Sequence, residues 1–440
     1  MSIEPLSRPE FATALRKGQG RALRHIVHYG IGDYKDLVLE ACLHNQNFDS
    51  QIDPCRAPWL FLMFRNTPFH DEFREAIFSN LDKASSWDLI QLCDFLREMA
   101  EVGDVLAREK LKEIVFTYAK LGTEDEPIIV EEFIDLQTGD ELIELAKIYG
   151  SRLRDDEHAF PFDGLIPDGK KQEFSQLLHQ HAQSDETVQI YFEYLDKRGV
   201  LDRSVSQCDR DAARKDSHER IRKQYKLEKI LIDARNKKGD FPGHYATFGK
   251  HATKEELDAV YASLISENDP EVLMRLLWVF RRAELPRLED VLFQWANGSD
   301  EGIRDSVITA LTQIKDEKVH ELAKEKVTKS DLLGPDNGAI GLFHKNYEES
   351  DAELISSALS SLMVNDEDAH ALGYDLIELS ELYEDANLSN ALEWVYEYTP
   401  CTFCRYRALM QLRKFGAIDA KIAEECQFDA NEDIRAFVNA

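Results

Sequence analysis

Residues 300–311 read Asp-Glu-Gly-Ile-Arg-Asp-Ser-Val-Ile-Thr-Ala-Leu, and the fold class can be predicted from this stretch. From Ile303 to Ile314, apolar residues recur at offsets 0, 4, 7, 8 and 11, which places them on one face of an α-helix. A second stretch, from Leu257 to Ile265, has apolar residues at offsets 0, 3, 4, 7 and 8. Because no segment shows strict two-residue alternation, the sequence predicts an all-α protein.

The C-terminal part of the chain repeats this helix start. Six starts place an apolar residue three positions after a capping or turn residue: Asp269/Val272, Asp300/Ile303, Asn337/Ile340, Asp366/Ala369, Cys401/Cys404 and Asn431/Ile434. Asp and Asn at such a position accept hydrogen bonds from the first-turn amides. A second helix fits between successive starts, so a two-helix unit of about 30 residues repeats. Such units bury their apolar faces by stacking, which predicts an α–α superhelix of stacked hairpins.

Residues 300–311 resemble the bacterial HEAT-repeat pattern, in which Asp is followed by an apolar-Arg pair and then by Ala-Leu. Residues 404–409 and 431–437 echo it, whereas the other three starts lack the Arg. The resemblance covers about residues 253–440. It implies an α-solenoid of HEAT/armadillo type with a concave binding surface, and it implies no catalytic chemistry.

The N-terminal half is also predicted to be helical, with five hairpins that continue the array. They pair 20–29 with 34–45, 57–65 with 68–82, 86–101 with 104–119, 127–134 with 139–153, and 170–181 with 185–198. The Pro- and Gly-containing segment 155–169 is the clearest break in this half. We therefore expect a hairpin array over 1–200, a junction over 201–252 and HEAT-like repeats over 253–440.

The composition favours a soluble, strongly acidic protein. The chain has 440 residues, 53 Lys and Arg against 83 Asp and Glu, and a net charge of −30. Its longest strongly apolar run, 59–64, is too short to span a bilayer, and residues 1–20 lack the apolar core of a signal peptide. Seven cysteines in mostly apolar helical patterns indicate reduced, buried thiols. We expect a cytoplasmic protein that does not bind membranes.

Residues 203–238 depart from this acidity, with twelve basic and six acidic side chains and a net charge of +6. Without Pro or Gly from Ser204 to Lys238, the segment is predicted to form one helix of about 30 residues. It could bind a nucleic-acid backbone, dock on an acidic surface of this protein or of a partner, or be a solvated helix. Its candidate binding residues are Arg214, Lys215, Arg220, Arg222, Lys223 and Lys226.

An aromatic, Gly-containing loop is predicted to follow over 240–251. Phe241, His244 and Tyr245 are candidate binding residues there, and the alternative is that the aromatic rings seal the core of the C-terminal repeats.

Other chemistry-bearing residues favour structural roles. Cys401 and Cys404 form a C-x-x-C pair at a helix start, which suits redox work, but no two further zinc ligands lie near them in sequence. The histidine pairs 25/28 and 179/181 likewise lack a third ligand. The acidic clusters 124–126, 155–157 and 366–368 fall in predicted turns and do not have calcium-loop spacing. We therefore predict no metal site and no cofactor.

The chain carries no nucleotide-binding, nucleophile-elbow or zinc-protease motif, so we predict no catalytic residue and no enzyme activity. The first hypothesis is a non-enzymatic scaffold or adaptor that binds a protein partner on its concave face. Because the chain is acidic, we expect the partner's surface to be basic. Alternatives are a nucleic-acid-binding or HEAT-like DNA glycosylase-type protein that uses 203–238, which the net charge disfavours, and a regulatory subunit of a bacterial multi-protein complex such as a defence complex. The single last helix, from about Asn431, either caps the array or docks on another molecule such as a second copy.

Overall fold

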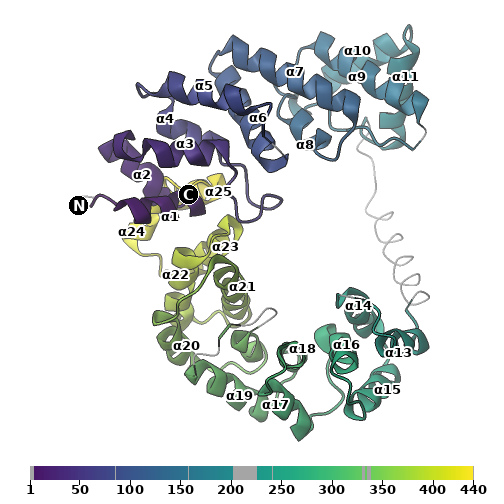
Figure 1. Cartoon of the computed structure of the whole chain (residues 1–440), viewed down its shortest axis with the longest axis vertical. Helices are drawn as coiled ribbons and strands as arrows, with labels where there is room; N and C mark the ends of the chain where they lie inside the picture. Colours follow the sequence, from purple (N-terminus) through teal and green to yellow (C-terminus); the bar gives the residue numbers. More distant parts are fainter. Residues whose placement is uncertain are drawn as a thin grey trace. The chain divides into compact units, whose positions relative to one another are not determined.

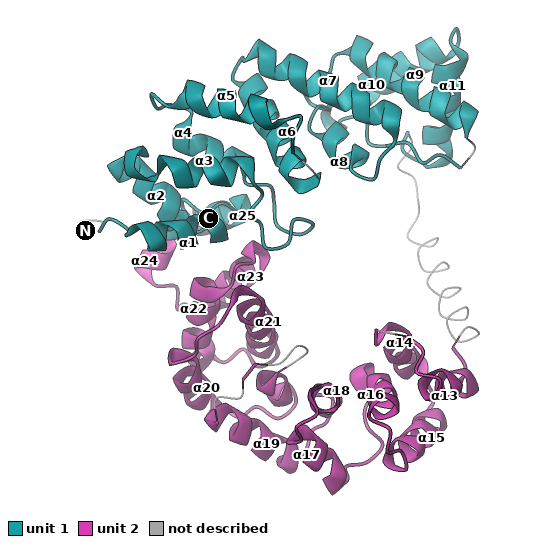
Figure 2. Cartoon of the chain, viewed as in Figure 1, with its two compact units in different colours: residues 1–207, 425–440 teal, residues 208–424 magenta. Residues whose placement is uncertain are grey.

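The computed structural model describes residues 4–84, 86–156, 158–201, 225–239, 241–329, 332–333 and 338–439. In these ranges the chain forms 24 α-helices and no β-strand, which confirms the all-α prediction (Figure 1). The chain divides into two compact units (Figure 2). The N-terminal unit comprises residues 1–207 and 425–440, and the C-terminal unit comprises residues 208–424.

The helices pack mainly on their neighbours in sequence, as helical hairpins do. In the N-terminal unit they are α1 (Arg8–Lys17), α2 (Gly20–Tyr29), α3 (Lys35–Leu43), α4 (Ala57–Phe64), α5 (His70–Asn80), α6 (Ser86–Glu101), α7 (Val105–Leu121), α8 (Glu126–Glu131), α9 (Gly139–Asp155), α10 (Lys171–Ala182), α11 (Glu186–Lys197) and α25 (Glu432–Asn439). The helices of all five predicted N-terminal hairpins are present, with ends that differ by a few residues. Between α9 and α10 the chain is irregular apart from one 3₁₀ turn, in agreement with the predicted break.

The C-terminal unit continues with helices of similar length. They are α13 (Leu227–Arg235), α14 (Gly243–His251), α15 (Lys254–Ile265), α16 (Pro270–Val279), α17 (Asp290–Ala296), α18 (Glu301–Leu311), α19 (Glu317–Thr328), α20 (Asp351–Ser360), α21 (Asp366–Tyr383), α22 (Ser389–Tyr398) and α23 (Thr402–Lys414), and α24 (Ala420–Cys426) crosses the boundary between the units. None of the described helices combines the length and hydrophobicity needed to cross a bilayer.

The predicted cap residues begin most of these helices. Asp269 accepts hydrogen bonds from the first-turn amides of α16, and the Asp300 side chain accepts one from the amide of Ile303 at 3.0 Å. At α21 the prediction was wrong by one residue, because the cap is Asn365 and not Asp366. The predicted start at Asn337 lies outside the described residues.

Two predictions for the junction were wrong. One helix over all of 204–238 is not formed, because the backbone at Lys226 is extended, with φ and ψ of −95° and 148°, and α13 already ends at Arg235. The predicted loop over 240–251 is largely helical, since α14 occupies Gly243–His251. Burial explains the second error: Tyr245 and Phe248 are 0% and 3% exposed, so packing of this face outweighs the local preference of a Gly-rich segment for a loop.

The last residues of the chain pack inside the N-terminal unit. The Trp59 indole Nε1–H donates to the carbonyl of Phe428 at 2.8 Å, and the amide of Ala430 donates to the carbonyl of Gly18 at 3.0 Å. Ile434 on α25 is fully buried. At least Ile434 of this last helix is therefore part of the buried interior.

A glycine permits this approach. A Cβ at position 20 would lie 2.0 Å from the carbonyl oxygen of Glu425, so only Gly20 leaves room for that backbone. One residue later, Arg21 Nε forms an ion pair with Glu425 Oε1 at 2.9 Å. Residues about 400 positions apart are thus joined by backbone contact, hydrogen bonds and charge.

Candidate functional site

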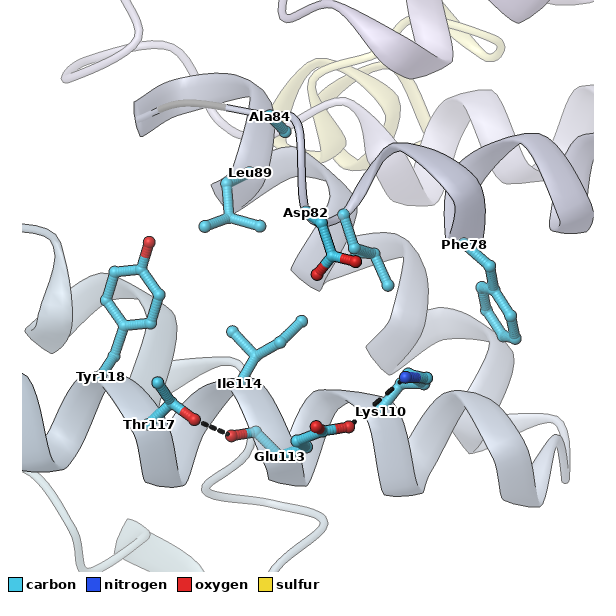
Figure 3. Close-up of a pocket in the computed structure, with 10 residues that line it drawn as sticks. Phe78, Asp82, Ala84, Leu89, Lys110, Glu113, Ile114, Thr117 and Tyr118 are labelled. Carbon is cyan, nitrogen blue, oxygen red and sulfur yellow. Dashed lines mark hydrogen bonds and ion pairs between the residues drawn. The ribbon is translucent and has the colours of Figure 1, made fainter.

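Two pockets in the N-terminal unit differ in size and charge. The smaller, about 300 Å³, lies between α5, α6 and α7 and is lined by Phe78, Leu81, Asp82, Ala84, Leu89, Lys110, Glu113, Ile114, Thr117 and Tyr118 (Figure 3). Along α7, Lys110 Nζ pairs with Glu113 Oε2 at 3.4 Å, and the Thr117 hydroxyl donates to the carbonyl of Glu113 at 2.8 Å. Since this pocket carries its own counter-charge, it offers little selectivity for a charged ligand.

The larger pocket, about 630 Å³, has no basic residue in its lining. We call it the acidic pocket. It is lined by Asn45, Asn47, Ser50, Gln51, Asp53, Cys55, Ser86, Trp87, Ile90, Glu124, Asp125, Ile128 and Glu132. Three segments supply these residues: the connection between α3 and α4, the start of α6, and the α7–α8 junction with α8.

Side-chain hydrogen bonds shape the connection between α3 and α4. The amide of Asn45 donates to Asp88 Oδ1 at 2.7 Å, which fixes this connection to α6. The amide of Asn47 donates to Asn45 Oδ1 at 2.9 Å, and Asn47 Nδ2 donates to the carbonyl of Pro54 at 3.1 Å. Short Asn side chains that bond to nearby backbone favour such turns over a helix. The result is a rim of amide and carboxylate groups held in place by its own backbone.

Glu132 connects the acidic pocket to a buried ionic group. Arg97 on α6 binds Asp94 of the same helix and pairs through Nε with Glu132 Oε2 at 2.9 Å. The side chains of Asp94 and Glu132 are 2% and 15% exposed. One guanidinium therefore contacts two carboxyl groups that are largely shielded from water.

This arrangement sets the protonation of Glu132. Burial, together with the charge of Asp94, raises the pKa of Glu132 to about 8, although Arg97 acts in the opposite direction. Burial and Asp94 also raise the pKa of the Cys55 thiol well above its usual range. At neutral pH the acidic pocket therefore holds a protonated Glu132 and a neutral thiol.

The chemistry of the acidic pocket suits an organic cation. Glu132 gives up its proton more readily once a positive group enters, and Asp53, Glu124 and Asp125 add negative charge around it. An aromatic side chain, Trp87, stands in the same lining, and indole is the best aromatic partner for a cation. A lysine or arginine side chain fits both requirements.

Of the six basic residues predicted to bind a partner at the junction, the structure describes one. Arg214, Lys215, Arg220, Arg222 and Lys223 lie outside the described residues. The last predicted cation, Lys226, is described, and it is exposed at the start of α13.

The aromatic candidates have different environments. Phe241 is 78% exposed, whereas Tyr245 is buried and donates its hydroxyl to the carbonyl of Lys238 at 2.8 Å. His244 is half-buried and packs against Tyr245, with ring centroids 4.0 Å apart, and burial lowers its pKa. The buried ring of Tyr245 serves the core of the C-terminal unit, which agrees with the alternative given for this segment.

Part of the basic segment engages acidic groups of its own unit. Lys237 Nζ lies 2.9 Å from Asp269 Oδ2 and 3.6 Å from Glu271 Oε1 at the start of α16. Lys238 Nζ lies 3.7 Å from Asp233 Oδ1. These exposed contacts involve only the last two cations of the segment, and the docking of the segment on an acidic surface stays a prediction.

The histidine pairs are not brought together as ligands. His25 is buried, and its Nδ1 accepts the amide proton of Leu6 at 3.1 Å, whereas His28 is exposed. His179 packs against the ring of Phe192, with centroids 5.4 Å apart. His25 therefore has a structural contact within the N-terminal unit.

The acidic clusters have mixed roles. Glu126 is buried and pairs with Arg152 at 2.6 Å, which ties α8 to α9. Its neighbours Glu124 and Asp125 line the acidic pocket. The cluster at 366–368 forms the first turn of α21, where negative charge favours the helix.

Sequence reasoning missed the buried ionic group that Glu132 connects to the acidic pocket. Arg97 and Glu132 are 35 positions apart, and neither stands in a motif. It also missed His370, which the fold places beside Cys401 and Cys404. Pairing of α6 with α8 and of α21 with α23 creates both groups, and single-sequence patterns carry no information about such contacts.

Comparison with known proteins gave no relative. No protein-family model matches the chain, and a search of curated proteins found no significant similarity.

Proposed function

We propose that this protein is a non-enzymatic helical-repeat scaffold of HEAT type that binds a basic segment of a protein partner. In this proposal a lysine or arginine side chain of the partner enters the acidic pocket. The observation that carries it is a 630 Å³ pocket with four carboxyl groups and no basic residue in its lining.

The charge of the whole chain supports the same partner class. A net charge of −30 attracts a basic segment over long range and raises its association rate. The acidic pocket then supplies short-range selectivity, since a buried, hydrogen-bonded cation is recognised by geometry as well as by charge. The repeat resemblance of residues 300–311 and the capped helix starts support the scaffold part of the proposal.

The test is the binding of a fluorescent tetra-arginine peptide to the full chain, measured by anisotropy. The charge-neutralising variant E124Q/D125N should weaken binding roughly tenfold, or about 1.4 kcal/mol. The matched control D82N/E113Q removes two charges from the smaller pocket and should leave binding nearly unchanged.

A tetra-glutamate peptide of the same length should not bind. Equal weakening by both double variants would show that only net charge attracts the peptide, and the acidic pocket would then not be the binding site.

A further inference from the structure

Three metal-ligating side chains meet in the C-terminal unit. Cys401 is the N-cap of α23, Cys404 lies in the first turn of that helix, and His370 lies on α21. Their ligand atoms are all within 4.8 Å of one another, and Cys404 Sγ lies 3.6 Å from His370 Nδ1. Neither cysteine is in a disulfide, and the two are 3% and 1% exposed.

These separations fit one tetrahedral cation. With Zn–S of about 2.3 Å and Zn–N of about 2.0–2.1 Å, a tetrahedral angle puts sulfur and nitrogen about 3.6 Å apart. We propose that His370, Cys401 and Cys404 bind a single Zn²⁺, with a fourth position left to water or another ligand. This inference is independent of the proposed peptide binding in the other unit.

The helix start is unusual in a way that favours metal binding. Asp269, Asp300 and Asn365 each cap their helix with a side-chain hydrogen bond, but Cys401 makes none to the first turn of α23. A thiol is a poor cap, so this position gives up cap stability. The same location stabilises a thiolate, because the amino end of a helix carries partial positive charge.

Close helix packing places the imidazole of His370 beside the two cysteines. Gly373 lies one turn after His370 on α21, and a Cβ there would lie 3.4 Å from Val395 and 3.9 Å from Thr399. Thr399 immediately precedes the segment that leads into Cys401. The packing of α21 against α22 and α23 therefore brings His370 to the two sulfurs.

A nearby cation supports the ionised thiol. Arg407, one turn after Cys404, forms a two-point ion pair with Glu381 at 3.1 and 2.8 Å. Its permanent charge lowers the cost of a thiolate at position 404.

A second group on α21 serves as the internal control. His344 Nδ1 lies 3.8 Å from Glu378 Oε2, and Asp375 completes that group. However, His344 Nε2 lies 3.2 Å from the backbone carbonyl of Asp375, so that nitrogen carries a proton and donates it. Only one nitrogen then faces carboxylates, and the thiol-containing cluster is the better match for zinc.

The experiment titrates the reduced, metal-free full chain with Zn²⁺ and, in parallel, with Co²⁺. Co²⁺ in a thiolate site gives sulfur-to-metal charge-transfer absorption and the intense visible bands of tetrahedral cobalt. Loss of an outer-shell partner already costs 10–100-fold in metal affinity, so removal of a ligand in H370A or C404S should cost more than about 100-fold.

C401S is the decisive variant. Serine is a good N-cap, so this variant should fold at least as well as the parent while losing the soft ligand. H344A and H28A should retain one Zn²⁺ per chain with unchanged cobalt spectra.

Three outcomes would overturn the proposal. They are a folded, reduced parent chain that binds no Zn²⁺, a C401S variant with the parent's cobalt spectrum, and loss of the metal in H344A. Formation of only a Cys401–Cys404 disulfide, with no metal bound by the dithiol, would instead assign the pair to redox chemistry.

Discussion

The acidic pocket and the His370–Cys401–Cys404 cluster gather reactive groups in different ways. The acidic pocket is lined by carboxyl oxygens, and a proton remains on Glu132, the partner of Arg97, because burial opposes a further charge. In the cluster, sulfur and imidazole nitrogen stand at the distance that a small soft cation requires. The donor type therefore separates the two: oxygen and indole favour an organic cation, and sulfur favours zinc.

The largest expected effect comes from removing the guanidinium of the buried ionic group. R97M leaves Asp94 and Glu132 without their buried counter-charge, and such a change typically costs about 3–5 kcal/mol of unfolding free energy. Urea denaturation at pH 7 measures it. The control R154M breaks the exposed pair with Asp155 and should cost less than about 1 kcal/mol.

Acid should partly restore R97M, because added protons remove uncompensated negative charge from this buried group. A loss that stays constant from pH 7 to pH 4.5 would mean that packing of the arginine stem, and not its charge, holds this part of the N-terminal unit.

The next effect is the pH dependence of stability. The pKa of Glu132 is raised to about 8 in the folded chain from an ordinary value of 4.5, so its contribution to folding is complete below 4.5 and is lost as pH rises through 8. E132Q mimics the protonated acid and lacks this loss. Between pH 4.5 and 8.5 its stability relative to the parent should rise by on the order of 2–4 kcal/mol.

Denaturation curves at several pH values measure this difference, with the exposed E144Q as control. If the stability difference between E132Q and the parent did not change with pH, Glu132 would ionise normally. The acidic pocket would then not hold a protonated carboxyl group at neutral pH.

How much of this could be predicted from sequence depends on the range of the contacts. Helices and most of their caps follow from local periodicity, and Asp269 and Asp300 act as the pattern indicates. The contact of Gly20 with Glu425 depends on residues about 400 positions apart, which no local pattern contains. For the same reason C-x-x-C was recognised but its third partner, His370, was not.

The predictions for the junction, residues 201–252, were wrong for a different physical reason. Absence of Pro and Gly permits a helix but does not specify one, and the backbone at Lys226 is extended. In α14, burial of Tyr245 and Phe248 stabilises a helix despite glycines at positions 243 and 249. Helix propensity is a weak guide where a few buried aromatic side chains decide the conformation.

A smaller effect links peptide binding to protons. A cation that enters the acidic pocket lowers the pKa of Glu132 from about 8, so binding releases a proton. Affinity for the tetra-arginine peptide should therefore rise between pH 6 and pH 8, by up to about tenfold per pH unit. Calorimetry in buffers of different ionisation enthalpy counts the protons directly.

E132Q should bind the peptide with little pH dependence over the same range. A parent chain that releases no proton on binding would place the peptide away from Glu132, on the exposed acidic surface.

The smallest effect concerns the His370–Cys401–Cys404 cluster. In metal-free buffer C401S should be more stable than the parent by about 0.5–1 kcal/mol, because serine supplies the cap hydrogen bond that Cys401 does not make in α23. Zinc at 100 times its dissociation constant should reverse the order, since it stabilises the parent by about 2.7 kcal/mol and has little effect on C401S. Thermal unfolding with and without zinc measures both changes. If C401S were less stable than the parent in both buffers, Cys401 would act as a packed core residue, and the poor cap would not reflect selection for a ligand.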